Sequence, residues 1–436
     1  MKETSEGLKR EIGVWGQSSN ILNSVIGAGI FVLPAIVAES LGAGSIIAYL
    51  FCGILITAIM LCFGEVGGKV THTGGAYKYI ESSFGRYFGF LTSNLFIFGA
   101  TIMACAAISN ALADTLAYLF PVFENRIMRS FFFVFLFSGF AVVNIIGVKS
   151  GITLVKINTI AKLTPLLILV IAGFSKISFS NLAIDKLPAA SDIGSVSVIL
   201  FFAFQGAENS LSISGEIKNP HKTTPRAIFI SFLLILTLYM LIQLISQGVL
   251  GDALADYKDA PLAEVANRIM GPAGMTLMII GAAISMFGYL SGDALNMPRV
   301  LFGAARDNVI PVKSLAAVHR KFATPYISII LFTSLGCFFA LVGEFKQLAI
   351  LSSASILLIY LGVALALIKS RLKKEKTTGS FRTPGGYFVP VISVLIILWF
   401  LSNLSWHEII GMISFITLLS LIYAGIGLFE KKKIST

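Results

Sequence analysis

The stretch that decides the fold is residues 20–34, which read NILNSVIGAGIFVLP. The segment is long and apolar, yet Gly27 and Gly29 lie one residue apart at its centre. Hydrocarbon offers no hydrogen-bond partners, so an unwound turn at membrane depth is tolerated only where protein or a water-filled cavity receives its backbone groups. The stretch therefore predicts a helix broken in mid-membrane, with a site at the break. Close helix–helix packing by small residues is the alternative.

The composition of the chain is that of a polytopic membrane protein. Of its 436 residues, 56% are hydrophobic and 13% are charged, whereas soluble domains average about 25% charged residues. The apolar runs are too long for strands, and a spanning helix needs roughly 20 apolar residues. We predict an all-α membrane protein with twelve transmembrane helices, at 18–40, 43–63, 86–118, 128–147, 153–175, 194–214, 225–250, 273–301, 325–343, 347–369, 387–404 and 408–429.

Lysine and arginine are distributed unevenly between alternate loops of this topology. With the N-terminus inside, the inner loops and tails hold 25 of the 33 basic residues and the outer loops hold 7. Basic residues mark the cytoplasmic loops, so both termini are predicted to be cytoplasmic in the inner (plasma) membrane. This bias also accounts for the net charge of +11 without a nucleic-acid partner.

Three loops carry patterns of their own. Residues 74–85 and 260–271 have glycine or proline at the ends that a short helix needs, and both are predicted to be short helices. Each suits either a gating element or a plain connection. The loop 369–386, rich in lysine, is predicted to be a solvated charged linker.

A second interruption lies in the sixth predicted span, where apolar residues 196–204 are followed by QGAENS at 205–210. Polar residues at this depth are costly and indicate function. The first and sixth spans are five apart, so two five-helix halves would begin on opposite faces, as in inverted-repeat transporters. Half-helix ends at the breaks would present donors to a carboxylate and acceptors to an ammonium. A zwitterionic amino acid supplies both groups.

The chain resembles the amino acid–polyamine–organocation (APC) superfamily along nearly its whole length. The motifs are GAGIF at 27–31 with Pro34, GGAY at 74–77 through FG at 84–85, FAFQGAE at 202–208, EIKNP at 216–220 with PRAI at 225–228, PRVL at 298–301 through ARD at 305–307, and TPGG at 383–386. The resemblance implies a LeuT-type 5+5 inverted repeat plus two C-terminal helices. Its parts are a first repeat at 18–176, a second repeat at 194–369, helices 11 and 12 at 387–429, and cytoplasmic tails at 1–17 and 430–436.

The same resemblance implies a substrate site at the two breaks. Amides around Ala28 and Gly29 would hold the substrate carboxylate. Backbone carbonyls would hold its amine, near Ile26, Phe202, Ala203 and Gln205. Phe202 would be an aromatic lid over the substrate, with ordinary apolar packing as the alternative.

Lys162 is an ionisable residue deep in the fifth predicted span. A buried amine can exchange a proton near neutral pH. The resemblance implies that this lysine replaces the second sodium of sodium-coupled relatives and bridges toward the first and eighth helices, with the Gly27 carbonyl and Ser291 as partners. A fixed structural cation is the alternative, and either reading argues against sodium coupling.

Two acids lie well inside the predicted spans, away from their ends. Glu208 follows the second break and is either a proton-linked carboxylate, a brace for the unwound segments or a helix cap. The resemblance implies a role in coupling or gating. For Asp293, in the eighth span, the resemblance implies a position near the distal substrate pocket, where an acid would suit a cationic side chain. A helix–helix hydrogen bond or a pair with Lys162 is the alternative.

These observations predict a secondary amino acid transporter that works by alternating access and is proton-linked or an exchanger. Cationic amino acids or their amines are the preferred substrates, with small neutral amino acids as the alternative. A non-transporting amino acid sensor is the alternative from another class. No nucleophile–base pair, metal cluster or phosphate loop is visible in the sequence, so neither enzyme activity nor a cofactor or metal is expected. The expected partners are the amino acid, protons and the lipid bilayer, for a monomer or homodimer.

Overall fold

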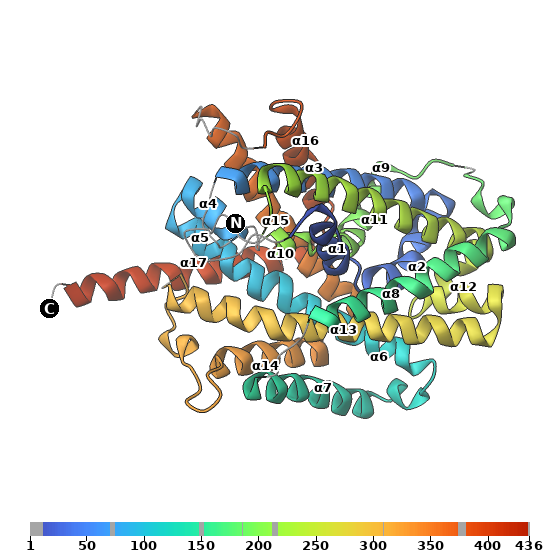
Figure 1. Cartoon of the computed structure of the whole chain (residues 1–436), viewed down its shortest axis with the longest axis horizontal. Helices are drawn as coiled ribbons and strands as arrows, with labels where there is room; N and C mark the ends of the chain where they lie inside the picture. Colours follow the sequence, from blue (N-terminus) through green and yellow to red (C-terminus); the bar gives the residue numbers. More distant parts are fainter. Residues whose placement is uncertain are drawn as a thin grey trace.

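The computed structural model describes residues 12–69, 75–147, 152–184, 186–211, 217–307, 309–373 and 381–434. These residues form helices and connections, with no strand beyond an isolated bridge between Ile12 and Ile217. In this part of the chain, eight helices are long and apolar enough to cross a membrane, and three shorter apolar helices accompany them. The predicted all-α class is therefore confirmed. Figure 1 shows the long helices lying mostly along a common direction.

Every predicted span coincides with helix. In chain order the helices are α1 (Val14–Val25), α2 (Gly29–Leu41), α3 (Ser45–Lys69), α4 (Gly75–Phe84), α5 (Arg86–Asn94), the π-helix η2 (Leu95–Thr101), α6 (Ile102–Ala117), α7 (Arg126–Ile146), α8 (Ile152–Gly173), α9 (Ala190–Leu200), the 3₁₀ turn η6 (Phe201–Ala203), α10 (Ala207–Leu211), α11 (Pro220–Leu250), α12 (Pro261–Met270), α13 (Pro272–Arg306), α14 (Tyr326–Val342), α15 (Phe345–Leu372), α16 (Phe388–Ser402) and α17 (Trp406–Ile434).

The first helix begins earlier than predicted. We placed residues 1–17 in the N-terminal tail, of which 1–11 lie outside the described residues, but α1 already begins at Val14. The polar residues that follow are buried against α11, where the Ser18 hydroxyl donates to the carbonyl of Ala227 at 3.4 Å. Protein contacts therefore extend the helix beyond the apolar run that the sequence shows.

The two predicted breaks are present, and they touch each other. The first separates α1 from α2, and the second separates η6 from α10. A Cβ placed on Gly29 would lie 2.7 Å from the Ala203 Cα, and one placed on Gly206 would lie 2.5 Å from the Ser24 carbonyl oxygen. Gly206 also has a φ of 110°, which glycine adopts without strain. Both contacts require glycine, which is why the breaks can meet.

Both predicted short helices are confirmed as α4 and α12. Helix α12 begins with Pro261 and ends before Gly271, whose φ of 73° stops the helix. Helix α4 ends in the same way before Gly85, with a φ of 96°. The first glycine of that loop, Gly74, lies outside the described residues.

The loop 369–386 is not the fully solvated linker that we expected. Its residues 374–380 lie outside the described part of the chain, but Arg371 and Thr383 on either side are buried. The Arg371 guanidinium pairs with the Glu65 carboxylate of α3, and the Thr383 amide donates to the same carboxylate at 2.7 Å. A buried arginine that is bonded in this way fixes α3, α15 and the segment that precedes α16 together.

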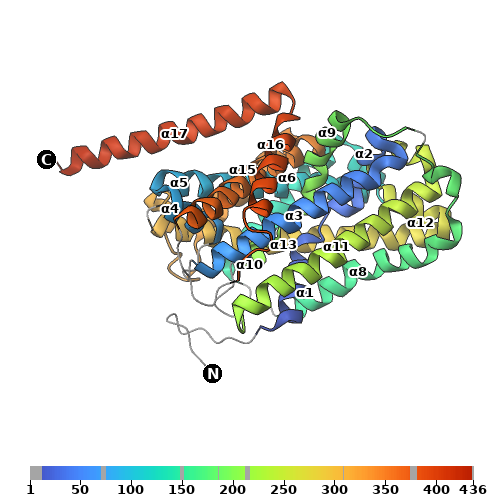
Figure 2. The same ribbon diagram turned by 90° about the horizontal axis from the view of Figure 1, so that it is seen from above.

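The last helix, α17, extends away from the other helices toward the C-terminus (Figure 2). It is attached by the ring of Tyr423, which packs on Tyr87 and Phe90 of α5 at 5.3 and 5.2 Å between centroids. The Tyr87 and Ser420 hydroxyls also share a hydrogen bond of 2.7 Å.

Candidate functional site

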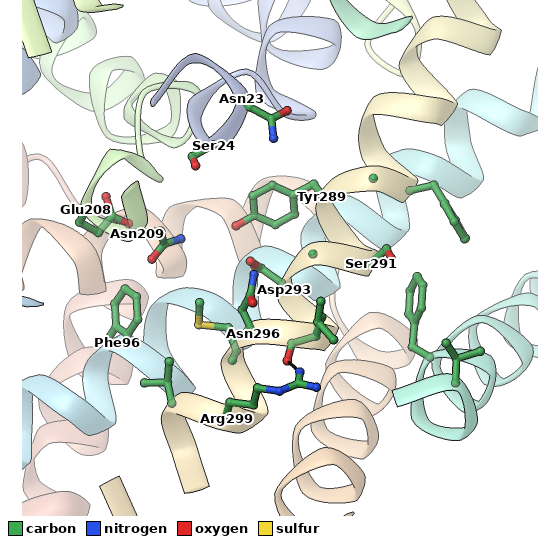
Figure 3. A pocket seen from close by; sticks show the side chains of 18 of the residues that line it. Asn23, Ser24, Phe96, Glu208, Asn209, Tyr289, Ser291, Asp293, Asn296 and Arg299 are labelled. Atoms are coloured by element: carbon green, nitrogen blue, oxygen red, sulfur yellow. Dashed lines mark hydrogen bonds between the residues drawn. The ribbon is translucent and has the colours of Figure 1, made fainter. Parts of the chain in front are cut away.

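A cavity of about 1690 Å³ lies between the C-terminal part of α1, α10 and α13. Figure 3 shows Ser24, Glu208, Tyr289 and Asp293 around one space, with Arg299 further along α13. The lining continues to Tyr77 on α4 and to the end of α13. The cavity thus connects the broken helices with one end of the helix bundle.

Lys162 enters this cavity from α8 and is buried, with 3% of its surface exposed. Its ammonium donates to the carbonyl oxygen of Asn23 at 2.6 Å and to that of Ile26 at 2.7 Å. Carbonyls in the last turn of a helix have no partner within the helix, and a cation complements the dipole there. Lys162 therefore caps the C-terminal end of α1 at the break.

The partners that we predicted for Lys162 are wrong. The Gly27 carbonyl instead accepts a bond from the Ser285 hydroxyl at 3.3 Å. Ser291 points to the other side of α13 from Tyr289 (Figure 3). The lysine reaches the first helix as expected. It bonds the carbonyls of Asn23 and Ile26, which lie before Gly27 in the chain, because these face α8 at the end of α1.

Glu208 joins the second break to α15. One of its carboxylate oxygens accepts a bond from the Gly206 amide at 3.0 Å and another from the Tyr360 hydroxyl. The first bond is a local cap, as one of our two readings had it. The second bond crosses to another helix, and the carboxylate also lines the cavity. Its part in proton coupling or gating stays a prediction.

Asp293 lies at the cavity wall with 7% of its surface exposed. Its carboxylate accepts a hydrogen bond from the Cys105 thiol of α6 at 3.7 Å. It accepts a second hydrogen bond from the hydroxyl of Tyr289, one turn earlier in α13. These partners match the helix–helix bond that we considered, and Lys162 is not among them. The carboxylate nevertheless faces the cavity (Figure 3).

The residues of the breaks themselves lie behind the cavity. The Tyr289 ring packs over the first break, 3.5 Å from where a Cβ on Gly27 would lie. The cavity lining does not include the seven break residues that we predicted to bind or gate substrate, Ile26, Gly27, Ala28, Gly29, Phe202, Ala203 and Gln205. The structure therefore brings Lys162, Glu208 and Asp293 together at the cavity and keeps the break backbone behind Tyr289.

Two of the carbonyls that we expected to hold the substrate amine already accept bonds from the protein. The Ile26 carbonyl is bonded by Lys162, and the Ala203 carbonyl accepts from the Tyr239 hydroxyl at 3.0 Å. Phe202 is 6% exposed, and its ring packs edge-on against Phe345 with centroids 5.8 Å apart. In this conformation the ring does not cover the cavity.

Sequence reasoning missed three tyrosines that organise the site. Tyr289 separates the cavity from the first break, Tyr239 bonds the second break, and Tyr360 bonds Glu208. No tyrosine was among the residues that we predicted for the site. Hydroxyl groups inside apolar runs were a usable signal, because a buried hydroxyl needs a partner.

Comparison with known proteins shows the family of the chain. The amino acid permease family matches residues 12–432. The serine/threonine exchanger SteT of Bacillus subtilis is 28% identical over 90% of this chain and 91% of its own. The branched-chain amino acid permease BcaP of Bacillus subtilis is 24% identical over 96% and 93%. The b(0,+)-type amino acid transporter 1 of Mus musculus is 25% identical over 92% and 83%.

A match over nearly the whole chain, on a bundle of apolar helices, makes this a multi-pass membrane protein of the kind that its motifs predicted. The chain belongs to the amino acid permease family, within the APC superfamily.

Proposed function

We propose that this permease is a secondary amino acid transporter that works by alternating access in the inner membrane, with twelve spanning helices and cytoplasmic termini. The observation that carries the proposal is the contact between two broken helices beside a cavity whose wall includes Lys162, Glu208 and Asp293. Paired breaks near the midplane are the site-forming feature of inverted-repeat transporters. The repeats would be 18–176 and 194–369, with two further helices at 387–429.

The first turn of α2 is the proposed site for the substrate carboxylate. Amides at the start of a helix have no partners within it, and the dipole there favours an anion. Ala28 and Gly29 supply these amides. Because Tyr289 packs over the neighbouring Gly27, its ring must move before a substrate reaches them. The substrate amine would then bind the carbonyls of Phe202 and Gln205, since those of Ile26 and Ala203 already accept bonds.

Coupling would be to protons or to a counter-transported amino acid. The Lys162 ammonium occupies the carbonyls at the end of α1, where a bound sodium would otherwise need oxygen ligands. Glu208 links the second break to α15, so a change in its proton occupancy would alter a contact between two moving parts.

Asp293 favours cationic amino acids as substrates. Its carboxylate lies at the cavity wall beyond the first break, where the substrate side chain would extend, and a buried acid there attracts a cation. The similarity to a serine/threonine exchanger favours a second candidate, exchange of small neutral amino acids.

The test is uptake into proteoliposomes that are preloaded with arginine, serine or no amino acid, with and without gradients of protons and sodium. We expect uptake that depends on the internal amino acid or on the proton gradient and not on sodium. Agmatine, which lacks the carboxylate of arginine, should compete at least tenfold less well than arginine. Sodium-driven uptake would contradict the role of Lys162, and binding without flux would indicate a sensor.

A further inference from the structure

The lining of the cavity includes residues of α7 and of the part of α13 that contacts it. These are Phe135, Gly139 and Phe140 of α7 and Ile284, Phe287 and Ser291 of α13. We call these six residues the lateral groove. Its lining is apolar apart from Ser291, so the groove differs in chemistry from the polar site described above.

The lateral groove is open to the surroundings of the helix bundle. Phe135 is 79% exposed and Phe287 is 51% exposed. A Cβ on Gly139 would meet no atom within 4 Å. The helices touch where the rings of Phe140 and Phe287 lie 5.4 Å apart. In a membrane protein such an opening faces lipid.

One face of α13 continues from the groove to two arginines. Ile284, Phe287 and Ser291 follow each other at helical spacing, and residues at 295, 299 and 306 extend the same face. Arg299 and Arg306 therefore stand beyond the apolar part, toward the end of α13, and both line the cavity.

The guanidinium charge of Arg299 is available to bind an anion. It donates to the carbonyl of Leu295 in its own helix, and no carboxylate among the described residues forms an ion pair with it. Arg306 uses its Nε for Asp307 at 3.2 Å. Its terminal nitrogens are not part of that bond. Guanidinium groups bind phosphate oxygens with two parallel hydrogen bonds.

We propose that the lateral groove binds one anionic phospholipid, with an acyl chain between α7 and α13 and the phosphate at Arg299 and Arg306. Basic pockets between transmembrane helices on the cytoplasmic side bind anionic headgroups, and the charge distribution predicts that this end of α13 is cytoplasmic.

The dimensions agree with this ligand. Twelve residues separate Phe287 from Arg299, which is about 18 Å along a helix. One leaflet contributes about half of a hydrocarbon core of roughly 30 Å. An acyl chain whose phosphate lies at Arg299 therefore reaches the two phenylalanine rings. The groove also opens into the cavity, so a bound lipid would form part of the wall of the substrate pathway.

Native mass spectrometry of the full-length purified protein tests the proposal. The protein is incubated with phosphatidylglycerol and phosphatidylcholine that carry the same acyl chains. Two arginines near a phosphate predict about 30-fold tighter binding of the anionic lipid. The double variant Arg299→Gln/Arg306→Gln should lose this preference, whereas Arg86→Gln, an exposed inner arginine outside the groove, should retain it.

A second pair of variants tests the acyl chain separately. Gly139→Trp fills the groove and should remove the tightly bound lipid. Gly411→Trp, on α17 and likewise in open space, should leave it bound. Equal binding of the two lipids by the unaltered protein would overturn the proposal, as would displacement of phosphatidylglycerol by millimolar glycerophosphoglycerol, which has no acyl chain. Retention of the lipid by Gly139→Trp would also overturn it.

Discussion

Replacing Gly29 with alanine tests whether the contact between the two breaks is required for function. The added Cβ would lie 2.7 Å from the Cα and 2.8 Å from the Cβ of Ala203. Carbon atoms prefer separations of about 3.5–4.0 Å, so the two breaks must move apart by about 1 Å. Ala203 cannot rotate away, because the nearest atom belongs to its backbone.

The expected size of the effect follows from that clash. Overpacking a tight contact with one methyl group costs about 1–3 kcal/mol. If this cost falls on the state that binds substrate, affinity drops by about 5- to 150-fold. Gly206→Ala should act in the same direction, since its Cβ would lie 2.5 Å from the Ser24 carbonyl oxygen and its φ of 110° disfavours alanine.

The assay is the concentration dependence of exchange in proteoliposomes, with arginine and serine as the two probes. Gly64→Ala is the matched control, because a Cβ on Gly64 would meet its nearest neighbour, Ile228, at an ordinary 3.6 Å. We expect Gly29→Ala to raise the half-saturating concentration or to abolish exchange, and Gly64→Ala to leave both unchanged. Equal behaviour of the two variants would refute the reasoning that the abutting breaks form the site.

Three further variants address the buried charges. Lys162→Met leaves two carbonyls of α1 without their donor, so we expect initial uptake to fall by at least about tenfold; unchanged uptake would show that the amine is dispensable. Asp293→Asn should reduce competition by arginine at least about tenfold more than competition by serine, and equal losses would remove the preference for cations. Arg371→Met removes the ion pair of the Glu65 carboxylate, which is 2% exposed; this costs about 3–5 kcal/mol and lowers the thermal unfolding midpoint. Adding Glu65→Leu should restore most of the midpoint, and no recovery would contradict a role for the ion pair.

The helices and the breaks were predictable because each has a local signature. Apolar runs located every helix that could span a membrane, and Gly27 and Gly29 located the first break. The second break was visible as polar residues that follow Phe204 in an apolar run. The start of α1 was not predictable, since Ser18 is buried by a partner more than 200 residues away.

The partners of the charged residues were less predictable than their positions. That Lys162 would be buried follows from its apolar neighbours, but which carbonyls it caps depends on where α1 ends and how α8 lies against it. The burial of Arg371 was missed for the same reason. Its sequence context is a run of lysines, and only the fold places Glu65 of α3 beside it.

The position of Lys162 also decides which end of a substrate the breaks can bind most strongly. The C-terminal end of α1 would attract an ammonium, but the lysine ammonium already satisfies its carbonyls. A second cation there would gain little from the helix dipole and would meet the charge of the lysine. Lys162 does not bond the N-terminal end of α2. The amides there have no partners within the helix, and they and the helix dipole both favour an anion. We therefore expect a substrate to be held mainly by its carboxylate, with the counter-charge for a cationic side chain supplied by Asp293, which does not bond Lys162.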